Sequence, residues 1–124
     1  MYQIVVWRSI LGLGAAVLPS LATANICSRL KTAGIEIDKP FTISYASDFG
    51  NYWSAAYGDL KPDCIAAPSS VEQMPHIVKE LHGFDTLFAV KSGGHMPNDG
   101  FARIQGDLLI STKNMNQVYY SEDD

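Results

Sequence analysis

Hydrophobic residues fall into short clusters along the chain, separated by glycine, proline and polar positions, and this pattern predicts alternating strands and helices. Residues 64–67 are apolar and stop at Pro68, which predicts a short buried strand. Apolar residues then recur at helical spacing behind Ser69 or Ser70 as the expected cap, and Gly83 ends this predicted amphipathic helix. Its expected buried face consists of Val71, Met74, Ile77, Val78 and Leu81.

Shorter patterns predict the remaining elements. Residues 87–90 and 108–111 are apolar runs that predict two more strands. Residues 26–33 predict a short helix closed by Gly34. Residues 41, 43 and 45 alternate with small polar residues, so residues 41–45 predict a strand, and residues 117–120 are a candidate for another.

The strand, helix and strand over residues 64–91 predict a βαβ unit with a right-handed crossover. The loop that ends this unit reads Lys91-Ser92-Gly93-Gly94-His95. Open α/β sheets bind ligands at the carboxyl ends of their strands. Paired glycines expose backbone N–H groups that suit a phosphate, while Lys91 adds a charge and Ser92 a hydroxyl. The residues alone equally allow a tight turn without a ligand, in which His95 only packs or donates a hydrogen bond.

The 124 residues, 47% of them hydrophobic, suffice for one small domain. Residues 1–24 resemble a secretory signal peptide, with an apolar stretch over residues 10–18 and small residues before a cleavage site after Ala24. An uncleaved membrane anchor is the alternative, but Pro19 interrupts the apolar stretch, so we expect no stable membrane span. Cleavage removes Arg8 and takes the net charge from −4 to −5, so nucleic acid is not an expected partner.

Two cysteines remain in an exported chain, Cys27 and Cys64, and the simplest prediction is one disulfide between them. Two buried thiols are the alternative. We predict no metal site, because the chain has no other cysteine and its three histidines are not spaced like zinc ligands.

Several segments agree in order and spacing with a known family: Cys64-Ile65-Ala66-Ala67-Pro68-Ser69-Ser70-Val71-Glu72-Gln73, Phe88-Ala89-Val90-Lys91-Ser92-Gly93-Gly94-His95, Gly100-Phe101-Ala102 and Leu108-Leu109-Ile110-Ser111. From about Tyr52 to the last residue, the chain resembles the start of the flavin-binding domain of FAD-linked oxidases of the vanillyl-alcohol oxidase/PCMH superfamily, in particular the berberine-bridge-enzyme-like branch. The resemblance implies an α+β fold, the incomplete N-terminal subdomain of a PCMH-type FAD-binding domain, with a small, mostly parallel sheet. The implied organisation is a signal peptide (1–24), a helix and aromatic loop region (25–59) and the partial FAD-binding domain (60–124).

The same resemblance implies FAD as the cofactor. Lys91, Ser92, Gly93 and Gly94 would hold its pyrophosphate, and His95 would be bonded through its ring to the 8α-methyl carbon of the flavin. An arginine often stands where Lys91 stands in the family, and lysine keeps the charge but not the bidentate fork. In a full-length relative, a small-molecule substrate gives a hydride to flavin N5, and dioxygen takes the electrons to form hydrogen peroxide.

The function we expect is therefore the N-terminal fragment or truncated form of a secreted FAD-dependent oxidoreductase, in a full-length form that serves fungal secondary metabolism. The alternatives are a catalytically inactive remnant and a small secreted binding module. We assign no catalytic residue, because the base of the relatives lies in later segments. We expect the 124-residue chain alone to be inactive, since about 100 mature residues are too few to surround FAD and also shape a substrate pocket.

Overall fold

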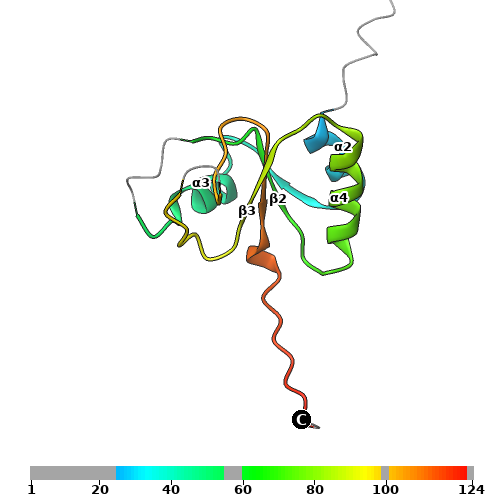
Figure 1. Cartoon of the computed structure of the whole chain (residues 1–124), viewed down its shortest axis with the longest axis vertical. Coiled ribbons are helices and arrows are strands. Elements are labelled where there is room, and N and C mark those ends of the chain that lie inside the picture. The colour runs from blue at the N-terminus through cyan, green and yellow to red at the C-terminus, as the bar shows by residue number, and fades with distance from the viewer. Residues whose placement is uncertain (1–24, 55–59, 99–100, 123–124) are drawn as a thin grey trace, which may run out of the picture.

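A computed structural model describes residues 25–54, 60–98 and 101–122, so the predicted signal peptide lies outside the described residues. The centre of the described part is a four-stranded sheet with helices on both faces (Figure 1). The strands are β1 (Glu36–Asp38), β2 (Cys64–Ala67), β3 (Phe88–Lys91) and β4 (Leu108–Ser111). The helices are α2 (Ile26–Thr32), α3 (Ile43–Gly50), α4 (Gln73–Gly83) and the short 3-10 helix η3 (Thr112–Asn114). Within the described ranges, every helix is too short or too polar to cross a membrane.

The sheet is mostly parallel, as predicted. Its strand order is β1-β2-β4-β3, in which β2, β4 and β3 run parallel while β1 pairs antiparallel with β2. Strand β4 therefore lies between the two strands of the predicted βαβ unit, which are not neighbours. Strand β1 was not predicted, because only Ile37 of its three residues is apolar.

Helices α2 and α4 cover one face of the sheet (Figure 1). This face is apolar throughout, and its buried core consists of Ile26, Cys27, Leu30, Ile35, Cys64, Ala66, Ile77, Leu81, Leu108 and Ile110. Cys27 of α2 and Cys64 of β2 form a disulfide within this core, which is the predicted pair. The bond fixes the start of the described chain to a central strand.

Helix α3 covers the opposite face (Figure 1). Its core is small and comprises Tyr45, Ile65, Ala89 and Leu109, with Phe49 and Ile104 packed beside them. The Tyr45 hydroxyl is buried and donates a hydrogen bond of 2.7 Å to the Pro62 carbonyl. Polar and charged residues occupy the rest of this face, as described below.

The prediction of a strand over residues 41–45 is wrong, because these residues lead into α3. The Thr42 side chain accepts a hydrogen bond from the Tyr45 amide and so caps the helix. Tyr45 and Phe49, four residues apart, then stack on one helical face with their ring centroids 6.2 Å apart. The alternation of residue types was a weaker signal than this capping and spacing.

Three other expectations need correction. Residues 117–120 form no strand, and Val118 among them is 93% exposed. Neither serine caps α4 as predicted: Glu72 holds the N-cap position, and the Gln73 side chain reaches back to accept a hydrogen bond from the Ser69 amide. Ile77 and Leu81 are buried as predicted and Met74 packs partly buried against the same core, whereas Val78 and Val71, which precedes the helix, are exposed and do not belong to its buried face.

Candidate functional site

The predicted glycine-rich loop begins where strand β3 ends. Lys91, the last residue of β3, pairs in register with Ser111, the last residue of β4. Parallel strand β2 ends at Ala67 along the same edge of the sheet. The loop of residues 92–95 therefore lies at the carboxyl edge of three parallel strands, where sheets of this kind bind ligands.

Gly94 is the anchor of this loop. It is buried and has a φ of +71°, a conformation that favours glycine. A Cβ atom at this position would lie 2.9 Å from the Asn51 carbonyl oxygen, which is backbone and too close for a carbon contact. The Gly94 carbonyl in turn accepts a hydrogen bond of 3.2 Å from the Trp53 amide. The loop is thus fixed against residues 51–53, and only glycine fits at the point of contact.

The other predicted loop residues face solvent. Ser92, Gly93 and His95 are exposed, whereas Gly94 and Lys91 are buried. The His95 ring lies beside Gly93, where an added Cβ would stand 2.8 Å from the imidazole Nδ1. The outer side of the loop therefore offers a hydroxyl, bare backbone and an accessible imidazole.

Lys91 differs from its neighbours because its side chain points beneath the loop. Its Nζ donates a hydrogen bond of 2.9 Å to the Asp48 carbonyl and lies 3.6 Å from Asp48 Oδ1. The same ammonium lies 4.8 Å from the centroid of the Tyr52 ring. Burial lowers the pKa of Lys91, and the charge of Asp48 opposes that shift. The Lys91 ammonium is therefore bound to Asp48 of α3 in the structure. The contact predicted between Lys91 and a pyrophosphate stays a prediction.

Asp48 belongs to an ionic cluster, which we define as the buried residues Asp38, Asp48 and Lys91 together with the partly exposed Lys113. Lys113 Nζ lies 2.7 Å from Asp38 Oδ2 and 3.0 Å from Asp48 Oδ2. Burial lowers the pKa of Lys113, but its hydrogen bonds to the two carboxylates outweigh burial and raise it. The cluster combines two carboxylates and two ammonium groups, so its charges balance.

Two serine hydroxyls extend this network: Ser44 donates to Asp38, and Ser111 lies 3.4 Å from Asp48 Oδ1. Sequence reasoning missed the cluster, although one signal was available. Asp48 stands three residues after Tyr45 and directly before Phe49, so it shares the inner face of α3.

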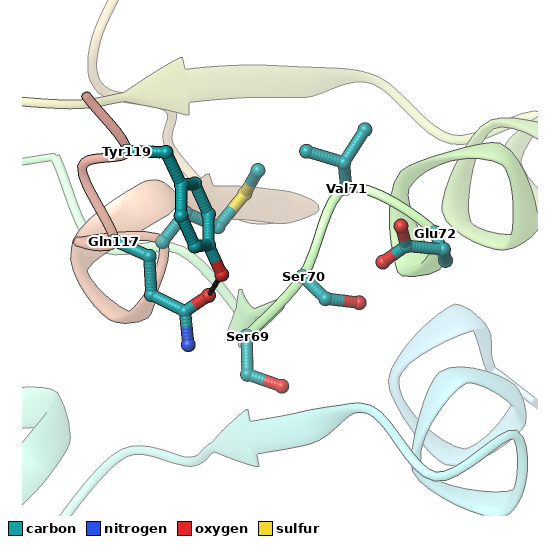
Figure 2. A pocket seen from close by; sticks show the side chains of 7 residues that line it. Ser69, Ser70, Val71, Glu72, Gln117 and Tyr119 are labelled. Carbon is teal, nitrogen blue, oxygen red and sulfur yellow. Dashed lines mark hydrogen bonds between the residues drawn. The ribbon is translucent and has the colours of Figure 1, made fainter. Parts of the chain in front are cut away.

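A pocket of about 340 Å³ opens beside the loops that follow β2 and β4 (Figure 2). Figure 2 shows Ser69, Ser70, Val71 and Glu72 on one side of the pocket and Gln117 and Tyr119 on the other. The Tyr119 hydroxyl is hydrogen-bonded to the Gln117 side chain. Sequence patterns do not indicate this pocket, because its two walls lie more than forty residues apart along the chain.

The disulfide lies away from the candidate loop. Cys64 is the first residue of β2, so the bond with Cys27 is at the amino-terminal edge of the parallel strands. Among the residues that the structure describes, no three His, Cys, Asp or Glu side chains are grouped as a metal site would require.

A parallel sheet with a glycine-rich loop at its carboxyl edge is the arrangement of a nucleotide-binding α/β protein. Comparison with known proteins shows which nucleotide-binding proteins the chain is similar to. An FAD-linked oxidoreductase of Arthroderma benhamiae is 39% identical over 115 residues, which are 92% of this chain and 23% of that protein. The FAD-dependent monooxygenase prx3 of Penicillium roqueforti is 34% identical over 101 residues, 81% of this chain and 20% of that protein.

Solved structures agree with these relatives. The carbohydrate oxidase of Microdochium nivale superimposes with a TM-score of 0.68 at 26% identity, covering 79% of this chain and 20% of the oxidase. Berberine-bridge-enzyme-like structures share the fold as well. No protein-family model matches the chain.

The chain is thus similar to a part of the FAD-linked oxidoreductases, and its sheet matches the PCMH-type FAD-binding fold of the related structures, which confirms the predicted resemblance and fold class. It spans about a fifth of the length of these relatives.

Proposed function

We propose that this chain contributes the glycine-rich part of the FAD site in a secreted FAD-dependent oxidoreductase. One observation carries the proposal: Ser92, Gly93 and His95 are exposed at the carboxyl edge of a parallel strand, while Gly94 anchors the loop from below. The cofactor named for the relatives, FAD, has a pyrophosphate and an electrophilic ring system, which match this set of groups.

The exposed residues fit FAD in their chemistry. Backbone amides around Gly93 suit a pyrophosphate, because no side chain separates them from a ligand, and the Ser92 hydroxyl adds a donor. The accessible His95 ring is a nucleophile when neutral, and we propose that it forms the covalent bond to the 8α carbon. Formation of this bond would release one N–H proton, one C–H proton and two electrons, and dioxygen would take up all four to form hydrogen peroxide. When bound, FAD supplies two-electron oxidation of a substrate, with reoxidation by dioxygen to hydrogen peroxide.

Secretion is part of the proposal. The apolar stretch of residues 1–24 supports it, and so does the Cys27–Cys64 disulfide, because such bonds persist in oxidising compartments. For the full-length form we propose a small-molecule substrate and a role in fungal secondary metabolism.

We propose that the 124-residue chain is inactive by itself. Strand β3 is an edge strand with Phe88 and Val90 exposed, as expected for a sheet that packs against more protein in an active enzyme. A nucleotide-binding but inactive chain is therefore the second candidate function. Production of peroxide by the purified chain with added FAD would contradict this inactivity.

The test is the intact mass and the absorbance near 450 nm of the mature protein secreted from a eukaryotic host. We expect the mass of one FAD to be added to the wild type and to be absent from His95→Ala. His82→Ala is the matched control, because His82 is also exposed but lies on α4. An unmodified wild-type chain, or a His95→Ala chain that keeps the added mass, would refute attachment at His95.

A further inference from the structure

The underside of the glycine loop rests on charged residues, although its outer side is the part expected to meet the ligand. We propose that Asp48 and Lys91 form a positioning pair, which holds the loop in its binding conformation from beneath. The identity of the ligand rests on the proposed function, but the positioning itself does not. Lys91 then acts through the conformation of Gly94 and not by touching a phosphate.

The side chain of Lys91 lies directly against Gly94. A Cβ atom there would lie 3.2 Å from Lys91 Cε and 3.4 Å from Tyr52 Cδ1, so the lysine stem and the tyrosine ring pass directly against this glycine. Together with the Asn51 carbonyl, they form the floor of the loop. Displacement of the Lys91 side chain would remove part of that floor.

Asp48 fixes the far end of the Lys91 side chain. Its carbonyl accepts the hydrogen bond from Lys91, and its carboxylate lies near both Lys91 and Lys113. Asp48 and Lys91 are 5% and 3% exposed. A buried ion pair of this kind is strongly affected when one partner is removed, because the other charge is left uncompensated. The position of the lysine therefore depends on helix α3.

The alternative role for Lys91 is a direct phosphate contact, and the two roles predict opposite effects of Asp48→Asn. If Asp48 positions Lys91, loss of its charge should disturb the loop and weaken ligand binding, as Lys91→Met does. If Lys91 contacts phosphate, Asp48→Asn should free its ammonium and leave binding unchanged or stronger.

The experiment uses the 124-residue chain and two readouts. The first is hydrogen exchange at the Trp53 amide, which donates to the Gly94 carbonyl and so reports on the loop without any ligand. The second is titration with ADP as a probe for the pyrophosphate site. Lys79→Met on α4 is the matched control, because it removes an exposed lysine outside the cluster.

We expect Lys91→Met and Asp48→Asn each to speed Trp53 exchange by ~10-fold, and the double variant to be no faster than Lys91→Met, because Lys91→Met already removes both the charge pair with the Asp48 carboxylate and the hydrogen bond to the Asp48 carbonyl. Lys79→Met should leave exchange unchanged. Lys91→Arg should restore most of the protection, since its guanidinium can still donate to Asp48, and this variant serves if the methionine variant does not fold.

Two results would overturn the inference. In one, the variants lower the unfolding midpoint but leave Trp53 exchange unchanged relative to the Ala46 amide of α3, which would mean a purely structural role. In the other, ADP binding weakens in Lys91→Met but not in Asp48→Asn. If no form of the chain binds ADP, the proposed nucleotide site fails in this chain, while Trp53 exchange still decides the positioning role.

Discussion

Replacement of Gly94 by alanine is the sharpest test of the loop geometry. Two separate effects act at this position: a φ of +71° that disfavours a side chain, and a Cβ position only 2.9 Å from the Asn51 carbonyl. Gly34 offers a matched control, because its φ is +83° and an added Cβ meets nothing within 4 Å. Gly34→Ala therefore measures the backbone effect alone.

The two substitutions should differ by a predictable amount. A left-handed conformation costs an alanine roughly 1–2 kcal/mol, and the reduced freedom of the unfolded chain offsets about 0.4–1 kcal/mol of this. Gly34→Ala should thus destabilise the fold by about 1 kcal/mol. Gly94→Ala should add roughly 1–3 kcal/mol for the forced shift of a backbone group, as in an overpacked core. We expect a total of about 3 kcal/mol for Gly94→Ala.

Urea denaturation of both variants and the wild type, followed by tryptophan fluorescence and circular dichroism, measures the difference. An excess of about 2 kcal/mol for Gly94→Ala corresponds to roughly a 30-fold change in the folding constant. Equal losses in the two variants would refute the reasoning. The carbonyl of Asn51 would then not lie against the loop, and the floor described for Gly94 would not exist.

Three further predictions concern other parts of the molecule. Reduction of the Cys27–Cys64 disulfide, whose partners are 37 residues apart, should lower the free energy of unfolding by about 4 kcal/mol. Urea denaturation with and without reductant measures this loss, and a value below about 1 kcal/mol would contradict the prediction. Burial raises the pKa of Tyr52 to about 12, so the folded chain keeps a proton that the unfolded chain releases near pH 10. The free energy of unfolding should therefore fall as the pH rises from about 10 to about 12. Tyrosine absorbance titration should therefore show a late-titrating group that is absent from Tyr52→Phe. We expect the isolated chain to self-associate through the exposed edge of β3, so Val90→Lys should reduce self-association in analytical ultracentrifugation. Val78→Lys on α4 adds the same charge away from the strand edge and should have less effect.

Local sequence patterns predicted the elements whose stability is decided locally. The apolar runs at 64–67, 87–90 and 108–111 each form a strand, and Gly34, with its positive φ, follows the end of α2 as predicted. These segments combine an apolar core with a clear stop signal, so few alternatives compete with the observed structure.

The strand order could not be predicted in the same way. Strand β4 is inserted between β2 and β3, and that choice depends on which strand can be buried on both sides. Leu108, Leu109 and Ile110 are all about 1% exposed or less, whereas Phe88 and Val90 of β3 remain partly exposed. The three consecutive large apolar residues of β4 fit a central position, but the sequence alone does not rank this arrangement against an adjacent β2–β3 pair.

The candidate loop was located from sequence, but its floor was not. The paired glycines after an apolar run mark a turn at a strand end, and that signal is local. The floor depends on Asp48 and Lys113, which lie 43 residues before Lys91 and 22 residues after it. Charged residues are expected on the surface, and although Asp48 shares a helical face with Tyr45, nothing in the sequence near Asp48 indicates that Lys91 and Lys113 are its partners.

The two faces of the sheet differ in what their buried groups contribute. The α2 and α4 side is apolar and crosslinked by a disulfide, and burial of such groups stabilises the fold without requiring a particular orientation. The α3 side buries two carboxylates and the Lys91 ammonium, with Lys113 partly exposed beside them, where apolar residues of similar size would often stabilise the fold as well or better. Ionic groups, unlike apolar ones, fix direction, because each must meet its partner at a defined distance and angle. The ionic cluster reaches the carboxyl edge of the parallel strands, directly beneath Gly94. The proposed cofactor site requires a fixed backbone at this place. Its position is therefore better explained by control of the loop than by stability of the sheet.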